Sequence, residues 1–238
     1  MNKKENLTLE EVINFLKDFE DKKRAALYNR HEEKELAQFK GIKIADLKKI
    51  EKKVKKNYQL SLDLFDTGIY EYMYLAGLIS EGEKMSEAEL IRWANNSTFS
   101  MIADYTIPLA CSNNANGLKL ALDWIDSSSE LVKSAGWSSL SKILTLDNKI
   151  IKDDVLKKLI HRVKDNIHEE DNRVRYSMNN FIIATGSYRP NLTKIAKEAA
   201  KEIGKVNVYM GQTACKVPDA LTYIEKIEKR KKNKQRKD

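Results

Sequence analysis

The sequence predicts an all-helical fold, built as a HEAT-like α-α superhelix of antiparallel helix pairs. The chain of 238 residues contains only nine glycines and three prolines, whereas sandwiches and barrels need many turns. Apolar residues recur at helical spacing in one segment after another. Short loops join these segments, and paired helices of this length are typical of an α-solenoid. A compact helical bundle is the alternative architecture.

The first helix is expected from Leu9 to Phe19, because Thr8 and Glu11 have the spacing of a capping box. A second helix is expected from Lys22 to Phe39. Ser86 and Glu89 repeat the capping spacing further along. The other helices expected in this half cover residues 44–54, 58–65, 69–79, 86–95 and 98–110.

The C-terminal half continues the same pattern. Pro218 is expected in the first turn of the last helix, where a missing N–H costs nothing. Only Val206–Tyr209 indicates extended structure. Residues 1–228 are therefore expected to form a single helical domain, followed by a disordered basic tail over residues 229–238. The remaining helices are expected over residues 117–125, 128–144, 153–167, 172–185 and 192–203.

Composition limits the class of protein. Hydrophobic residues make up 42% of the chain, as in globular proteins. No stretch has the roughly 18 apolar residues of a membrane span, and Met1–Glu10 has no apolar run after its lysines, so no secretory signal is expected. Cys111 and Cys215 indicate thiols in a reducing compartment, hence the cytoplasm. The histidines are too scattered for a metal site, so no metal is expected. No cofactor is expected either, and the protein is expected to be a monomer.

The net charge of +8 is concentrated in two blocks. Residues 40–56 hold eight lysines against two acids, and residues 229–238 hold seven basic residues against one acid, so the rest of the chain is net negative. Clustered cations favour a polyanionic partner. The alternative is a solvated helix face and a frayed terminus.

One carboxylate, Asp104, is the only charged residue of the apolar segment 98–110. A buried carboxylate is costly unless it is paired. Asp104 must therefore face solvent, pair with a neighbouring lysine or arginine, or occupy a polar cleft.

The segment 168–180 combines an apolar face with a polar one. At 100° per residue Val174, Met178 and Phe181 point inward. The roughly opposite face can bind phosphates and stack on bases, or can form a structural network between repeats. Its members are Asn172, Arg175, Tyr176 and Asn179.

A loop over residues 210–218 places Cys215 beside Lys216. A neighbouring ammonium lowers the pKa of a thiol and makes it more nucleophilic. A structural cysteine is the alternative, because no histidine lies nearby in the sequence.

Several segments resemble the DNA alkylation repair family of HEAT-repeat proteins. Gly41–Ile50 (GIKIADLKKI) is similar to one family helix and Tyr70–Ile79 (YEYMYLAGLI) to another. Trp93 precedes the Asp104 helix much as a tryptophan precedes the catalytic segment of the family. Trp124 and the helix after it are similar to the next family motif. The resemblance spans roughly residues 35 to 205 and implies the HEAT-like fold.

The resemblance implies a DNA-binding repair protein with alkylpurine glycosylase activity on cationic bases alkylated at ring nitrogen N3 or N7. Asp104 matches the catalytic aspartate, whose charge would stabilise the developing cation. Ser100 stands where active members have a tryptophan, Lys133 keeps one cation and Ser134 replaces an arginine. The chain is thus similar to a divergent branch. The expected DNA-binding residues are Lys133, Asn172, Arg175, Tyr176, Asn179 and Lys216.

Two other functions remain open. One is a non-catalytic binder of damaged or branched DNA, and the other is a HEAT-like scaffold for protein interactions. Family resemblance supports a fold more directly than an activity.

Overall fold

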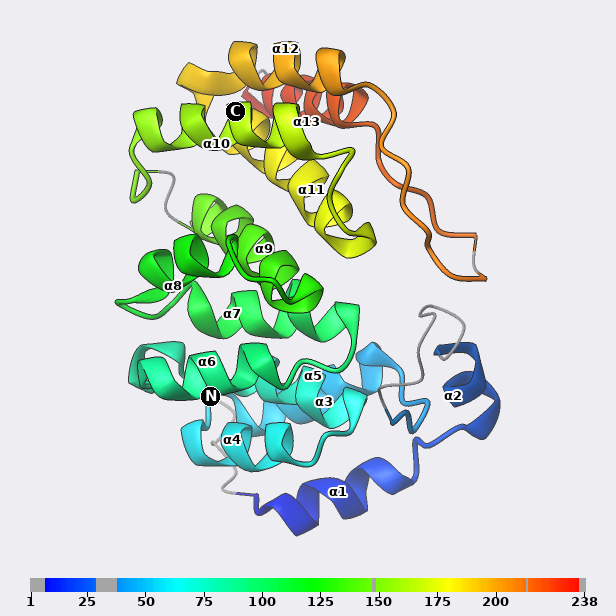
Figure 1. Ribbon diagram of the computed structural model, residues 1–238. Coiled ribbons are helices and arrows are strands. Elements are labelled where there is room, and N and C mark those ends of the chain that lie inside the picture. The colour runs from blue at the N-terminus through cyan, green and yellow to red at the C-terminus, as the bar shows by residue number, and fades with distance from the viewer. Residues whose placement is uncertain (1–6, 29–37, 147–148, 213, 236–238) are drawn as a thin grey trace.

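The computed structural model describes residues 7–28, 38–146, 149–212 and 214–235. Helices stack in layers, with the N-terminal helices at one end of the molecule and the C-terminal helices at the other (Figure 1). The all-helical HEAT-like prediction is confirmed. Within the described ranges, strand pairing is limited to one isolated bridge between Gln38 and Ile69. None of the described helices is both long and apolar enough to cross a membrane.

The N-terminal half follows the expected order. Both capping boxes are confirmed, since Thr8 pairs with Glu11 and Ser86 with Glu89 through reciprocal hydrogen bonds. Each box satisfies backbone donors that the first turn of a helix leaves open. The helices are α1 (Leu9–Lys17), α2 (Lys22–Tyr28), α3 (Ile44–Val54), α4 (Tyr58–Asp66), α5 (Tyr70–Ile79), α6 (Glu87–Asn95) and α7 (Ile107–Cys111).

The expected second helix is wrong at its end. α2 stops at Tyr28, residues 29–37 lie outside the described part, and residues 38–42 are not helical. The buried Glu71 carboxylate accepts backbone N–H groups of Lys40 (3.0 Å), Gly41 (2.6 Å) and Ile42 (3.2 Å). Gly41 has a positive φ of 75°, which disfavours a helix. The carboxylate thus replaces the hydrogen bonds that a helix would have provided.

The expected helix over residues 98–110 is interrupted. A π-helical turn covers Ile102–Thr106 and leads directly into α7. Pro108 explains the interruption, because it has no N–H to donate to the carbonyl of Asp104 four residues earlier. Asp104 therefore lies in a widened turn, a local geometry that is common at functional sites.

The C-terminal half is organised around a long central helix, α11, which packs against α9, α12 and α13. The buried side chains form two hydrophobic clusters that meet where α8 packs against α9. Gly136 permits this contact, since a Cβ there would lie 2.8 Å from the backbone nitrogen of Ile125. The helices are α8 (Gly117–Trp124), α9 (Glu130–Leu146), α10 (Asp153–Asn166), α11 (Asn172–Tyr188), α12 (Thr193–Ile203) and α13 (Ala220–Gln235).

The predicted boundary at residue 228 falls inside a helix. α13 continues through residues 229–235, so the expectation of a disordered tail is wrong for these residues. Ile224 is fully buried next to Gly186, and Lys231 donates a hydrogen bond to the carbonyl of Ser187. These contacts anchor the helix.

The connection between α12 and α13 is a long loop, residues 204–219, which runs away from both helices (Figure 1). Val206–Tyr209 forms no strand. Pro218 precedes α13 instead of lying in its first turn, because Asp219 caps that helix by accepting the backbone N–H of Thr222 at 2.8 Å.

Candidate nucleic-acid interface

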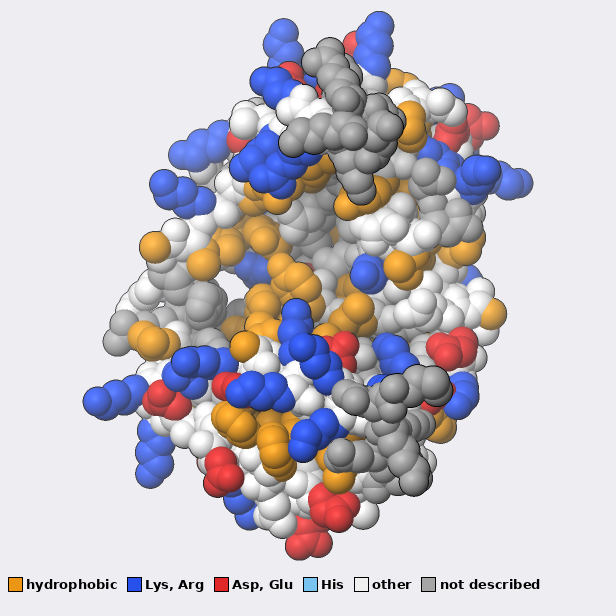
Figure 2. Space-filling model, turned by 180° about the vertical axis from the view of Figure 1, so that it is seen from behind, with side chains coloured by type: hydrophobic (Ala, Val, Ile, Leu, Met, Phe, Trp, Pro, Cys, Tyr) orange, Lys and Arg blue, Asp and Glu red, His pale blue; other side chains and the backbone are white. Residues whose placement is uncertain are grey.

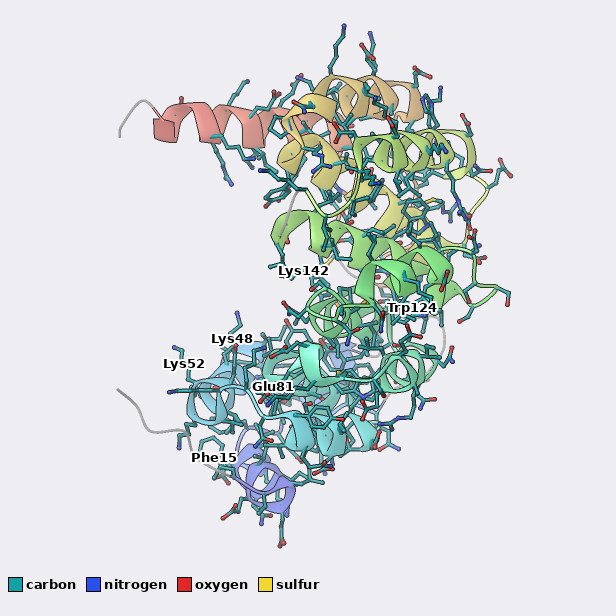
Figure 3. The ribbon with its side chains drawn as sticks, turned by 90° about the vertical axis from the view of Figure 1, so that its left-hand side faces the viewer. Phe15, Lys48, Lys52, Glu81, Trp124 and Lys142 are labelled. Atoms are coloured by element: carbon teal, nitrogen blue, oxygen red, sulfur yellow. The ribbon has the colours of Figure 1, made fainter. Side chains whose placement is uncertain are left out.

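The stacked helices give the molecule a C-shaped outline in Figure 3, and the opening of the C is the hollowed face seen in Figure 2. α3 forms one lip of this concave face and α13 forms the other. Lys48 and Lys52 stand on the α3 lip, and Lys142 of α9 borders the opening between the lips (Figure 3). Cations therefore come from both ends of the helix stack.

The lysines of α3 divide into two faces. Lys49 pairs with Asp46 at 2.7 Å and lies over the Phe19 ring, and Lys53 lies over the Phe15 ring at 4.9 Å. Lys48 and Lys52, four residues apart and hence on one face, are exposed and form no ion pair within the described part of the chain. The first face packs on α1, and the second stays available to a partner.

Asp104 is enclosed by its own partners. Its Oδ1 accepts the hydroxyls of Ser134 (2.6 Å) and Ser138 (3.3 Å), and its Oδ2 accepts Nη2 of Arg173 at 2.6 Å. The side chains of Asp104 and Arg173 are 4% and 11% exposed. Of the three expected environments for this carboxylate, the structure has the ion pair.

A small cavity of about 110 Å³ adjoins this ion pair. Ser138 lines it, and Lys142 stands one helical turn further along α9, so the cavity lies on the concave side. Small-molecule pockets are typically about 300 Å³ or larger. Burial, with Tyr176 and Asp104 nearby, raises the pKa of Tyr105 to about 12, so its hydroxyl keeps its proton. The lining residues are Asp104, Tyr105, Ser138, Ser141, Tyr176 and Asn180.

The sequence interpretation did not include Arg173 among the site residues. Its backbone N–H donates to Glu130 at 2.7 Å, and its guanidinium lies 4.5 Å from the centre of the Tyr176 ring. A carboxylate on an apolar helix predicts a cation nearby. However, Arg173 and Arg175 lie in the same segment, and sequence alone could not show which of them reaches Asp104.

The predicted polar stripe of α11 is divided between two neighbours. Tyr176 turns toward Asp104, whereas Asn172, Arg175 and Asn179 face the loop 204–219. Asn172 exchanges two hydrogen bonds with the backbone of Tyr209, at 2.9 and 2.6 Å. The expectation of one exposed stripe is therefore corrected, because the loop covers most of it.

Three further expected DNA-binding residues form no hydrogen bond or ion pair with Asp104 in the described part of the chain. Asn179 is 2% exposed and donates to the carbonyl of Pro218 at 2.9 Å. Lys133 pairs with Glu170 at 2.9 Å, with both side chains less than one-fifth exposed. Lys216 is exposed on the loop. The structure thus brings Tyr176 to Asp104 but not these three residues.

The tryptophans all belong to the core. Trp93 stacks on Phe65 with ring centroids 4.2 Å apart, Trp137 meets Phe181 edge-on at 5.2 Å, and Trp124 is 6% exposed. None of the three is exposed on the concave face to hold a DNA backbone. The described residues also contain no cluster of side chains suited to a metal ion.

Comparison with known proteins shows the family to which the chain belongs. The family model for DNA alkylation repair enzymes matches residues 12–224, and the chain belongs to this family. It is 34% identical to an uncharacterized protein of Listeria monocytogenes over 95% of this chain and all of that protein. An uncharacterized protein of Listeria innocua is also 34% identical, over 94% of this chain and 99% of that protein.

A solved structure is similar over nearly the whole chain. It is described as a new family of proteins related to the HEAT-like repeat DNA glycosylases with affinity for branched DNA structures. The TM-score is 0.84 and the sequence identity 29%, with 94% of this chain and 95% of that chain covered.

Proposed function

We propose that the protein is a non-catalytic DNA-binding protein that recognises branched DNA through its concave face. The observation that carries the proposal is the presence of exposed cations on both lips of that face. Lys48 and Lys52 stand on one lip and Lys229 and Arg230 belong to the helix of the other. Phosphate neutralisation by such side chains drives DNA binding. Two separate basic lips suit two duplex arms that diverge from a junction.

A relative supports the same substrate class, because the similar solved structure belongs to proteins with affinity for branched DNA. DNA as the partner also agrees with membership in the DNA alkylation repair family.

The environment of Asp104 supports a non-catalytic role. A glycosylase carboxylate must present its charge to the cationic sugar of the substrate. Here the Arg173 guanidinium offsets that charge and two serine hydroxyls occupy Oδ1. The adjoining cavity of about 110 Å³ is too small to enclose a base. The alkylpurine excision that the resemblance implies therefore lacks both the exposed carboxylate and the positioning tryptophans.

The binding test compares a four-way junction with a duplex of the same sequence over a range of salt concentrations. We expect tighter binding to the junction. The double variant Lys48→Gln, Lys52→Gln should lower the slope of log affinity against log salt by about two, one for each lost phosphate contact. The matched control is Lys157→Gln, Lys158→Gln on α10, which lies on the opposite side of the molecule (Figures 1 and 3). Equal slopes in the two double variants, or no junction preference, would favour the protein-interaction scaffold.

The activity test measures release of a methylated purine from duplex DNA. We expect no release by the parent protein. Release that Asp104→Asn abolishes would establish a glycosylase with this carboxylate in its active site. Release that survives Asp104→Asn would establish a glycosylase that uses another group. Either result would contradict the non-catalytic proposal.

A further inference from the structure

A second cavity lies on another side of α11, next to the loop 204–219. It has a volume of about 700 Å³ and separates α11 from the loop 204–219. The loop is pinned at two points, by Asn172 to Tyr209 and by Asn179 to Pro218. Because Asn172 and Asn179 are two helical turns apart, the loop bridges the surface between them. Arg175 lies in that interval and lines the cavity.

Arg175 lines the cavity, and its guanidinium forms no ion pair within the described part of the chain. Its Nε is buried and has no hydrogen-bond partner within the described part of the chain. A guanidinium that has no ion-pair partner is available to an anionic ligand. A planar guanidinium fits the oxygens of a phosphate.

The charge of the lining favours an anion. Lys205 and Lys216 also line the cavity and form no ion pair within the described residues. Asp219, the acidic residue of the lining, accepts a hydrogen bond from the backbone of Thr222 and is committed to capping α13. Three cations therefore face a single carboxylate.

The other walls suit a base. Tyr209 is 47% exposed and lines the cavity, and bases stack on such rings irrespective of sequence. Apolar side chains complete this wall, namely Val206, Val208, Met210, Val217 and Pro218. A volume of about 700 Å³ is within the range of small-molecule pockets.

We infer that this cavity binds one nucleotide of an unpaired strand, with the phosphate on Arg175 and the base against Tyr209. The inference deepens the proposed function and rests on it, since forks, flaps and some junctions have unpaired nucleotides at the branch point. Lys205 and Lys216 add to the attraction for phosphate. The nucleotide site is separate from the lips, which hold duplex arms.

Cys215 provides a reporter inside the cavity. It lines the cavity and is exposed, whereas Cys111 is buried with its pKa raised by burial to about 12. A thiol reacts as its thiolate, so neutral iodoacetamide should label Cys215 and spare Cys111. The labelling rate of the full-length protein then measures occupancy of the cavity.

The experiment follows labelling in the presence of dTMP, thymidine or inorganic phosphate. We expect dTMP to slow labelling, thymidine to have little effect, and phosphate to act more weakly than dTMP. Arg175→Gln should weaken protection by dTMP about tenfold or more, as loss of a charged hydrogen bond implies. The double variant Lys157→Gln, Lys158→Gln is the control and should keep the parent response. No protection by dTMP, equal protection by thymidine, or unchanged protection in Arg175→Gln would overturn the inference.

A further comparison with a single-stranded oligonucleotide and a four-way junction that has unpaired nucleotides at its branch point separates the two proposals. Protection by both, lost in Arg175→Gln, supports entry of an unpaired nucleotide. The junction could instead protect Cys215 in Arg175→Gln as well, while dTMP has no effect. This result would mean that DNA covers the loop from outside. It would overturn the nucleotide site and support branched-DNA binding. Protection by dTMP in a protein that binds no junction would leave the nucleotide site and overturn the proposed function.

Discussion

At the scale of single residues, the ion pair between Asp104 and Arg173 joins the π-helical turn before α7 to α11 almost out of contact with water. Removing one partner leaves the other charge buried and unpaired, which typically costs about 3–5 kcal/mol. We expect Arg173→Met to lower the free energy of unfolding by an amount in this range. The double variant Asp104→Asn, Arg173→Met should be more stable than Arg173→Met alone. Urea unfolding of the three proteins tests this, and equal stability of single and double variants would contradict it.

The carboxylate of Glu71 contributes to stability because both of its oxygens accept backbone N–H groups. A glutamine has one accepting oxygen, so in Glu71→Gln an NH₂ group would confront at least one of the N–H donors of Lys40, Gly41 and Ile42. An unsatisfied buried donor costs about 1–3 kcal/mol, and we expect a loss of stability of this size. Glu83→Gln, at an exposed position, is the control. A glutamine variant as stable as the control would show that the carboxylate does not hold residues 40–42.

Glu71 also makes stability depend on pH. Burial raises the pKa of its carboxyl above 4.5 in the folded protein, although the backbone donors oppose this shift. Between the unfolded and folded pKa values the folded state binds more protons, so the free energy of unfolding should fall as pH rises through that interval. Glu71→Gln should lack this part of the pH dependence and Glu83→Gln should keep it. Denaturant titrations at a series of pH values above 4.5 measure the difference.

At the scale of elements, most helices could be predicted because their signals are local. Capping boxes at Thr8 and Ser86 and apolar stripes at helical spacing need only neighbours a turn away. The failures have distant causes. The non-helical segment 38–42 depends on Glu71, some thirty residues later, and the polar face of α11 is covered by the loop 204–219. Asp104 could be singled out from sequence, but its pairing with Arg173 required the packing of α9 against α11.

The C-terminal end of α13 also depends on distant contacts that the sequence does not reveal, and its deletion tests its role in DNA binding. The sequence predicts that its basic end is disordered, but Lys231 contacts Ser187 and Tyr188 of α11. Deleting residues 229–238 removes this anchor and the exposed Lys229 and Arg230, while the buried Ile224 remains. We expect a folded protein whose DNA affinity depends less steeply on salt, because fewer phosphates are neutralised. An unchanged slope would remove α13 from the proposed interface.

At the scale of the whole molecule, two hydrophobic clusters meet where α8 packs against α9. In stacked repeats, stability depends on contacts between neighbouring layers. Gly136→Val would place side-chain atoms against the backbone of Ile125 and force the two helices apart. We expect the variant to unfold in two steps, the fluorescence of Trp93 reporting one cluster and that of Trp137 the other. Thr145→Val, at an exposed site on α9, is the control. Coincident transitions in Gly136→Val, measured in single-tryptophan backgrounds, would refute the idea of two units.

The concave face has its lips near opposite ends of the helix stack, α3 on one side and α13 on the other (Figure 3). The distance between the lips depends on the curvature of the stack, which results from a small rotation at every intervening layer, as in other solenoids. We therefore expect the distance between the two lips to change through small bends at many layers of the stack, and not through a single hinge. A slight change of tilt between α8 and α9 would be magnified at the lips. Substitutions in the tightly packed middle layers, far from any DNA contact, would therefore change the range of angles between duplex arms that the protein can bind.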